Sequence, residues 1–97
     1  MHFQKQDLAE SHYTWKEGAS YSGQPSRRLF DRFNGNQVLF LINFYGSLSE
    51  RFTIREGKEI EYGITHHLPL EAKSEISVFN WIREADWRSQ GKPQVVN

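Results

Sequence analysis

The hydrophobic positions of this chain are concentrated in one central stretch, Asn36–Gly46, which reads N-Q-V-L-F-L-I-N-F-Y-G. Apolar residues follow one another without a break from Val38 to Ile42. β-Branched and aromatic side chains favour a strand, and a short unbroken apolar run between turn residues is typical of a strand buried on both faces. The pattern predicts a central strand over Val38–Tyr45. One face would meet a helix, and the other would meet the N-terminal segment or a second copy of the chain.

Two alternating segments follow, Arg51–Arg55 and Glu59–Ile64, joined by the turn-like residues 56–58. In each segment apolar side chains occupy every second position, as in a strand with one buried face. A three-residue loop would place Arg55 opposite Glu59, and such a cross-strand pair contributes roughly 0.2–1 kcal/mol. The pattern therefore predicts a β-hairpin beside the central strand.

The clearest helical pattern lies near the C-terminus, from Ser74 to about Ser89. Ser74 is a good N-cap residue, and Gly91 follows the last turn. Ile76 and Trp87 lie on nearly the opposite side from the main apolar face, so this helix presents a second apolar surface. The main face, which we expect to pack on the sheet, contains Val78, Trp81, Ile82 and Ala85, with Phe79 at its edge.

The segment before the central stretch, residues 26–34, fits two structures. As a helix it would end at Gly35, because glycine favours the left-handed conformation that often follows a helix. As a strand it would pair with the central strand through an Asn34-Gly35 turn, which is a strong hairpin signal. The adjacent apolar residues Leu29 and Phe30 favour the helix.

The two ends of the chain lack a regular pattern. Residues 1–25 are irregular or form a short helix, and residues 90–97 form a loose tail. Trp15 and Tyr21 are large rings in a loop rich in small residues, and we expect them to pin that loop to the core. The alternative is that the two rings form a surface contact with a partner. The predicted fold is a single α+β domain over residues 1–97. It would contain a three- or four-stranded antiparallel sheet with the C-terminal helix packed on one face.

Composition narrows the functional classes. The 97 residues carry a formal net charge of zero and include no cysteine. Zero charge argues against a duplex nucleic-acid binder, and the lack of thiols excludes disulfides, thiol catalysis and thiolate metal sites. The apolar run is far shorter than the about 20 residues that span a membrane, and the N-terminus lacks the apolar core of a signal peptide. We therefore expect a cytoplasmic protein without membrane contact.

Catalytic and metal-binding chemistry has little support. Adjacent strand residues point to opposite faces, so His66 and His67 are not expected to share one metal ion. Tyr62 and His66 would lie about 13 Å apart along a strand, too far for direct proton transfer. The sequence contains no phosphate-binding glycine loop, nucleophile elbow or zinc-protease motif. We expect no cofactor, and an enzyme or metal protein around His66 and His67 is the least supported hypothesis.

Protein interaction has the best physical motive, because the two-sided strand and the second helix face place apolar surface outside a single core. We expect a non-enzymatic protein that acts as a homodimer or as an accessory or regulatory subunit, with residues 1–25 either completing the core or exchanging between subunits. Its predicted contact residues are Leu39, Leu41, Tyr45, Ile76, Arg83 and Trp87. The alternative is a single-strand nucleic-acid binder, since aromatic rings on a sheet stack unpaired bases. The predicted contact residues of that alternative are Arg27, Arg28, Arg32, Arg51 and Arg55.

Overall fold

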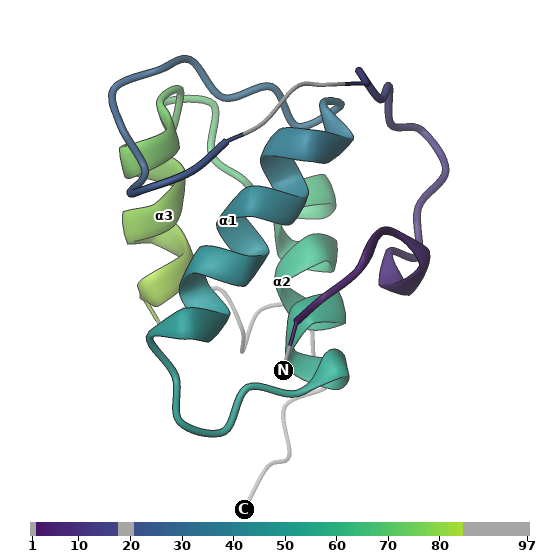
Figure 1. Cartoon of the computed structure of the whole chain (residues 1–97). Coiled ribbons are helices and arrows are strands. Elements are labelled where there is room, and N and C mark those ends of the chain that lie inside the picture. The colour runs from purple at the N-terminus through teal and green to yellow at the C-terminus, as the bar shows by residue number, and fades with distance from the viewer. Residues whose placement is uncertain (1, 18–20, 85–97) are drawn as a thin grey trace, which may run out of the picture.

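The computed structural model describes residues 2–17 and 21–84. These residues form three α-helices and one short 3-10 helix, with no β-strand among them (Figure 1). The predicted α+β fold with its antiparallel sheet is therefore wrong, because the described chain is helical. The elements are η1 (Lys5–Asp7), α1 (Gly35–Ser47), α2 (Ile54–His66) and α3 (Glu75–Arg83).

Helix α1 lies in the middle and packs against both α2 and α3 (Figure 1). The connection from α1 to α2 lies at one end of the three-helix bundle (Figure 1). The connection from α2 to α3 and the loop over residues 21–34 lie together at the opposite end, which we call the loop end. The N-terminal segment runs along the side of α2 that faces away from α3 (Figure 1).

The central apolar stretch is helix α1 rather than a strand. Asn34 caps its N-terminus, because its side-chain oxygen accepts a hydrogen bond from the Gln37 amide. Val38, Leu41 and Ile42 recur with helical spacing and are fully buried. An unbroken apolar run fits a buried helix as well as a buried strand, so the predicted central strand is wrong although the stretch does lie at the centre of the core.

The predicted hairpin is helix α2. Thr53 caps this helix by accepting a hydrogen bond from the Glu56 amide, and Glu56 places a carboxylate in the first turn. Ile60 and Ile64 are both buried inside the bundle. They are four residues apart, a spacing that returns to the same side of a strand and of a helix alike. The alternation in this segment therefore did not identify a strand.

Residues 26–34 form neither of the two predicted structures. They run as an irregular segment in which Leu29 makes an isolated antiparallel bridge with Ser74. The Phe30 amide donates a hydrogen bond to the Lys73 carbonyl at 2.8 Å. The chain then enters α1 directly, so the expected hairpin turn does not form.

The predicted C-terminal helix is confirmed at its start. Ser74 caps α3 with its side-chain oxygen. On the predicted apolar face Val78, Phe79 and Ile82 are buried and Trp81 is half-buried, with α1 in the place of the expected sheet, whereas Ala85 lies outside the described residues. The helix ends at Arg83, earlier than the predicted end near Ser89. Trp87 and the predicted tail lie outside the described residues.

The N-terminal segment completes the core of the same chain. Phe3 is fully buried, and its ring lies so close to Gly57 of α2 that a Cβ atom there would overlap it. The Asn43 side chain accepts a hydrogen bond from the Phe3 amide and donates one to the Phe3 carbonyl, both at 2.8 Å. As predicted, Trp15 and Tyr21 hold their loop to the helices: the Trp15 ring covers the first residue of α1, and the Tyr21 ring packs on the side of α1.

Candidate functional site

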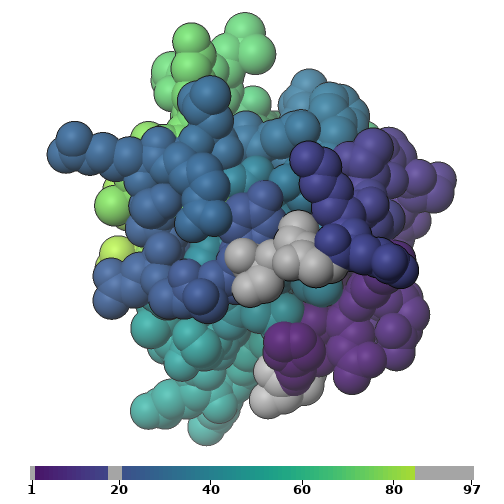
Figure 2. Space-filling model, turned by 45° about the horizontal axis from the view of Figure 1, so that its top comes forward, coloured from purple at the N-terminus to yellow at the C-terminus, as the bar shows by residue number. Residues whose placement is uncertain are grey.

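A groove of about 470 Å³ opens at the loop end, between residues 29–33 and residues 68–73. Figure 2 shows these two segments, in blue and green, standing beside each other on the surface. We call this hollow the end groove. Its apolar lining consists of Leu29, Phe30, Phe33, Leu68, Pro69, Leu70 and Ala72.

Hydrogen bonds fix the two walls of the end groove relative to each other and to α1. The Phe30 amide donates to the Lys73 carbonyl at 2.8 Å, which joins the walls. Gln37 of α1 is buried, and its side-chain oxygen accepts from the Asp31 amide at 2.8 Å. The Gln37 amide group also donates to the Leu29 carbonyl at 2.9 Å. The two walls are therefore irregular segments whose shape is fixed by hydrogen bonds.

A buried carboxylate stabilises the wall formed by residues 29–33, which we call the first wall. Glu75, the first residue of α3, is fully buried. It accepts hydrogen bonds from the Gln37 amide group at 2.8 Å and from the Ser26 backbone amide at 3.0 Å. It also forms an ion pair with Arg28 at 3.2 Å. A buried charge is tolerated only when it is paired and hydrogen-bonded. The one sequence signal for this network was the polar Gln37 directly before the apolar run, and the sequence reasoning missed it.

Large apolar side chains remain exposed around the end groove. Leu70 is 87% exposed, Leu29 is 76% exposed and Phe33 is 48% exposed. Single exposed apolar residues are ordinary on a protein surface. Here three of them border one hollow, and a cluster of that kind is typical of a binding surface.

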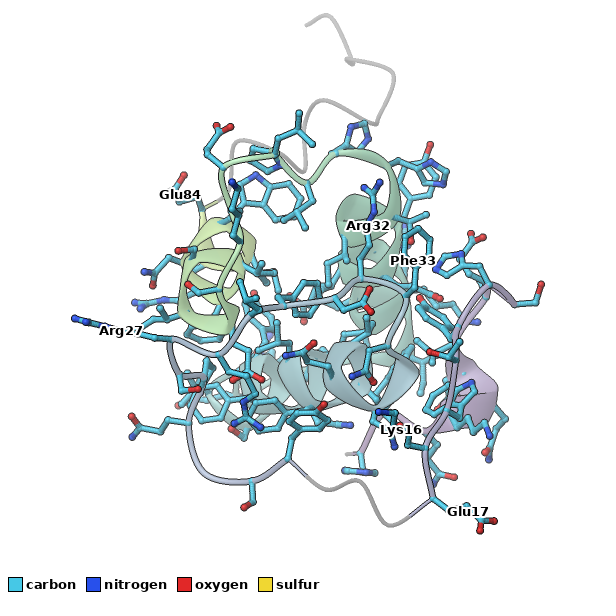
Figure 3. All side chains as sticks on the ribbon, turned by 90° about the horizontal axis from the view of Figure 1, so that it is seen from above. Lys16, Glu17, Arg27, Arg32, Phe33 and Glu84 are labelled. Carbon is cyan, nitrogen blue, oxygen red and sulfur yellow. The ribbon has the colours of Figure 1, made fainter. Side chains whose placement is uncertain are left out.

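Two cations line the end groove, one from each wall: Arg32 and Lys73, which we call the basic rim. Both are exposed, and neither makes an ion pair with another described residue. The Arg32 guanidinium lies 5.5 Å from the centre of the Phe33 ring. Figure 3 shows Arg32 and Phe33 together, whereas Arg27 points away at the outer edge. The third charged lining residue, Asp31, accepts a hydrogen bond from the Phe33 amide at 2.9 Å and so serves its own loop.

The predicted contact residues that the structure describes do not gather in one place. Leu41 is fully buried in the core, and Leu39 and Tyr45 are half-buried on α1. Ile76 is exposed at the start of α3, and Arg83 is exposed at its end. Tyr45 and Arg83 do share a second hollow of about 460 Å³, beside the C-terminal ends of α1 and α3. The two-sided strand that motivated this set does not exist, and Leu41 is covered by the chain itself.

The five predicted nucleic-acid contacts divide between the two ends of the bundle (Figure 1). Arg27, Arg28 and Arg32 lie at the loop end, and Arg28 is paired with the buried carboxylate of α3. Arg51 and Arg55 lie at the opposite end, where the α1–α2 connection runs into α2. Arg55 makes its predicted ion pair, but along α2 rather than across a hairpin. The structure therefore does not join these arginines into one basic surface.

The histidine pair lies at the end of α2. Tyr62 and His66 are one helical turn apart, and their ring centres are 4.4 Å apart, so the predicted separation of about 13 Å along a strand is wrong. His66 is exposed, and the Nε2 atom of His67 is buried without a hydrogen-bond partner in the described chain. No group of three or more metal-ligating side chains is close enough to hold a metal ion within residues 2–17 and 21–84.

A second buried carboxylate, which the sequence reasoning also missed, fastens the N-terminal segment to α2. Glu61 accepts hydrogen bonds from the Ala9 amide at 2.7 Å, the Glu10 amide at 3.1 Å and the Tyr13 hydroxyl at 2.6 Å. Burial, followed by the hydrogen bond to Glu61 and its negative charge, raises the pKa of Tyr13 well above its usual value. These contacts hold the N-terminal segment on α2 and account for the burial of the Glu61 carboxylate.

Within the described chain, no helix has the length and apolar character needed to cross a membrane. No family model, no curated protein and no solved structure matches this chain.

Proposed function

We propose that this protein is a non-enzymatic interaction domain that binds a segment of another protein in the end groove. The observation that carries the proposal is the exposure of Leu29 and Leu70 on two walls of fixed geometry. Covering two leucine side chains contributes roughly 3–6 kcal/mol before the costs of association. Because association itself costs about 4 kcal/mol or more, the two leucines need the other contacts of the groove, and we expect a weak, reversible complex. A cytoplasmic location is part of the proposal and rests on the sequence alone.

The chemistry of the groove favours binding over catalysis. Its charged lining residues, among those the structure describes, are Asp31, Arg32 and Lys73, and no histidine is part of the lining. The His12 ring contacts Phe33, with 5.3 Å between the ring centres. A catalytic site usually brings a nucleophile or a general base together with a group that orients it. The Asp31 carboxylate instead accepts a backbone hydrogen bond within its own wall.

The shape of the chain also bears on the expected homodimer. Residues 2–17 cover one side of α1 and α2 from within the same chain, so no open strand face needs a second copy. A two-fold dimer through the end groove would bring the two copies of Arg32 and Lys73 close together, since such an interface pairs a surface with itself. We therefore propose a different protein as the partner.

Selection of short random peptides displayed on phage tests the proposal. The full chain is the bait, and each selected peptide is then measured against the variants Leu29→Asp/Leu70→Asp and Leu48→Asp. Leu48 follows the last residue of α1 and is 63% exposed, so Leu48→Asp is the control for an aspartate at an exposed leucine outside the groove lining. We expect peptides whose affinity falls at least ~10-fold with the double variant and is unchanged with Leu48→Asp. Circular dichroism checks that each variant is folded. If no peptide is enriched, or if the double variant binds as well as the original chain, the proposal is wrong.

A further inference from the structure

We infer that the segment bound in the end groove is acidic and carries large apolar side chains. This inference rests on the function proposed above and adds the chemistry of the partner. The basic rim supplies one cation from each wall, and neither cation forms an ion pair with another described residue. The one carboxylate in the lining, Asp31, is engaged with the Phe33 amide. Asp31 keeps its charge in this hydrogen bond, so the two cations and one carboxylate of the lining leave a net charge of +1 beside apolar surface.

The positions of the cations define what complements them. Arg32 stands over the ring of Phe33, so a partner that covers the ring places its neighbouring residue at the guanidinium. Lys73 lies three residues beyond Leu70 on the other wall. A carboxylate beside the apolar anchor on each wall would complement the cation of that wall, because opposite charges at the rim of an apolar contact improve specificity and association rate.

Basic partners and second copies fit this groove poorly. A lysine or arginine beside the apolar anchor would face Arg32 or Lys73, and like charges brought together suppress binding. Single-stranded nucleic acid shares the negative charge and stacks on aromatic rings. It also needs a basic track along its backbone. At the loop end Arg28 is paired with Glu75 and Arg27 points away at the outer edge (Figure 3), and Arg51 and Arg55 lie at the other end of the bundle. The observations therefore favour an acidic peptide segment.

The test repeats the phage selection on two baits, the original chain and the variant Arg32→Glu/Lys73→Glu. Lys16→Glu/Arg51→Glu is the control, because it changes the net charge by the same amount with two exposed residues outside the groove lining. We expect Asp and Glu beside Leu, Phe or Trp in peptides selected on the original chain and on the control. Their affinity should fall roughly 2- to 30-fold with the rim variant and also in high salt. Selection on the rim variant should then enrich Lys and Arg.

The possible outcomes separate this inference from the proposed function. Peptides that require Leu29 and Leu70 but are neutral or basic would overturn the inference and leave the function standing. If no selected peptide depends on Leu29 and Leu70, the inference and the proposed function are both wrong. A labelled single-stranded oligothymidine is measured in parallel. Binding that is lost with Arg32→Glu/Lys73→Glu and retained with the control would assign the groove to nucleic acid and overturn the inference.

Discussion

The substitution Gly57→Ala should destabilise this protein, although alanine normally stabilises a helix. Gly57 lies inside α2, where replacing glycine by alanine contributes about 1 kcal/mol of helix stability. The new Cβ atom would overlap the ring of Phe3, which is fully buried. Removing a buried phenylalanine side chain costs about 3–5 kcal/mol. If the ring is expelled, the two effects combine to a loss of about 2–4 kcal/mol in the free energy of unfolding.

A double-mutant cycle measures this reasoning directly. In the Phe3→Ala background the ring is gone, so Gly57→Ala should become neutral or stabilise the protein by up to about 1 kcal/mol. Urea unfolding followed by circular dichroism gives the four free energies, provided that each transition is two-state. The reasoning is refuted if Gly57→Ala stabilises the original chain, or if its effect has the same sign and size in both backgrounds. Either result would mean that Phe3 does not pack on α2.

Three further predictions concern the buried polar groups and the assembly state. Because folding raises the pKa of Tyr13, the unfolded chain loses the Tyr13 proton at a lower pH than the folded chain. The free energy of unfolding should therefore fall as pH rises above about 10. Urea unfolding across that range should show a smaller fall in Tyr13→Phe. Gln37→Leu should cost about 2–4 kcal/mol, because it leaves Glu75 and the Leu29 carbonyl short of donors; a loss below about 1 kcal/mol would contradict this role. Light scattering should give the mass of a monomer at two concentrations, and a dimer that Leu29→Asp/Leu70→Asp dissociates would contradict the argument from the basic rim.

The parts of the fold that could be predicted are those set by local signals. Ser74 marks the start of α3 because its side chain accepts a hydrogen bond from the first turn, an interaction that needs only a few neighbouring residues. The packing of Trp15 and Tyr21 was also predictable, since large rings in a loop gain most by covering apolar neighbours. These inferences did not depend on knowing which elements meet in space.

The sheet was predicted wrongly because the strongest apolar pattern does not discriminate between structures. A continuous apolar run, or apolar residues four positions apart, fits a strand and a helix equally well. The capping residues were therefore the signals that distinguish the two structures. Thr53, three residues before Glu56, is the signature of a helix start, and Asn34 stands in the same position before α1. Gly57 was interpreted as a turn residue, whereas its lack of a side chain makes room for Phe3.

The end groove could not be predicted, because its two walls come from segments that are far apart in the sequence. Their alignment depends on the hydrogen bond between Phe30 and Lys73 and on the bridge between Leu29 and Ser74. Neither contact has a local signature. Once α1 is known to be a helix, however, the buried amide of Gln37 needs partners, and that requirement leads to the wall it supports.

Stability and binding should therefore respond to different residues. Phe3 and Gly57 lie where the N-terminal segment meets α2, and neither lines the end groove. Gln37 also lies outside the lining, yet it hydrogen-bonds the backbone of the first wall at two points. Gly57→Ala should therefore destabilise the fold without changing the affinity of a groove-bound peptide. Gln37→Leu should cause a stability loss of similar size and also lower that affinity, because only this substitution changes the shape of the wall. The buried amide, rather than any exposed residue, is thus the element that links the helical core to the surface we propose as functional.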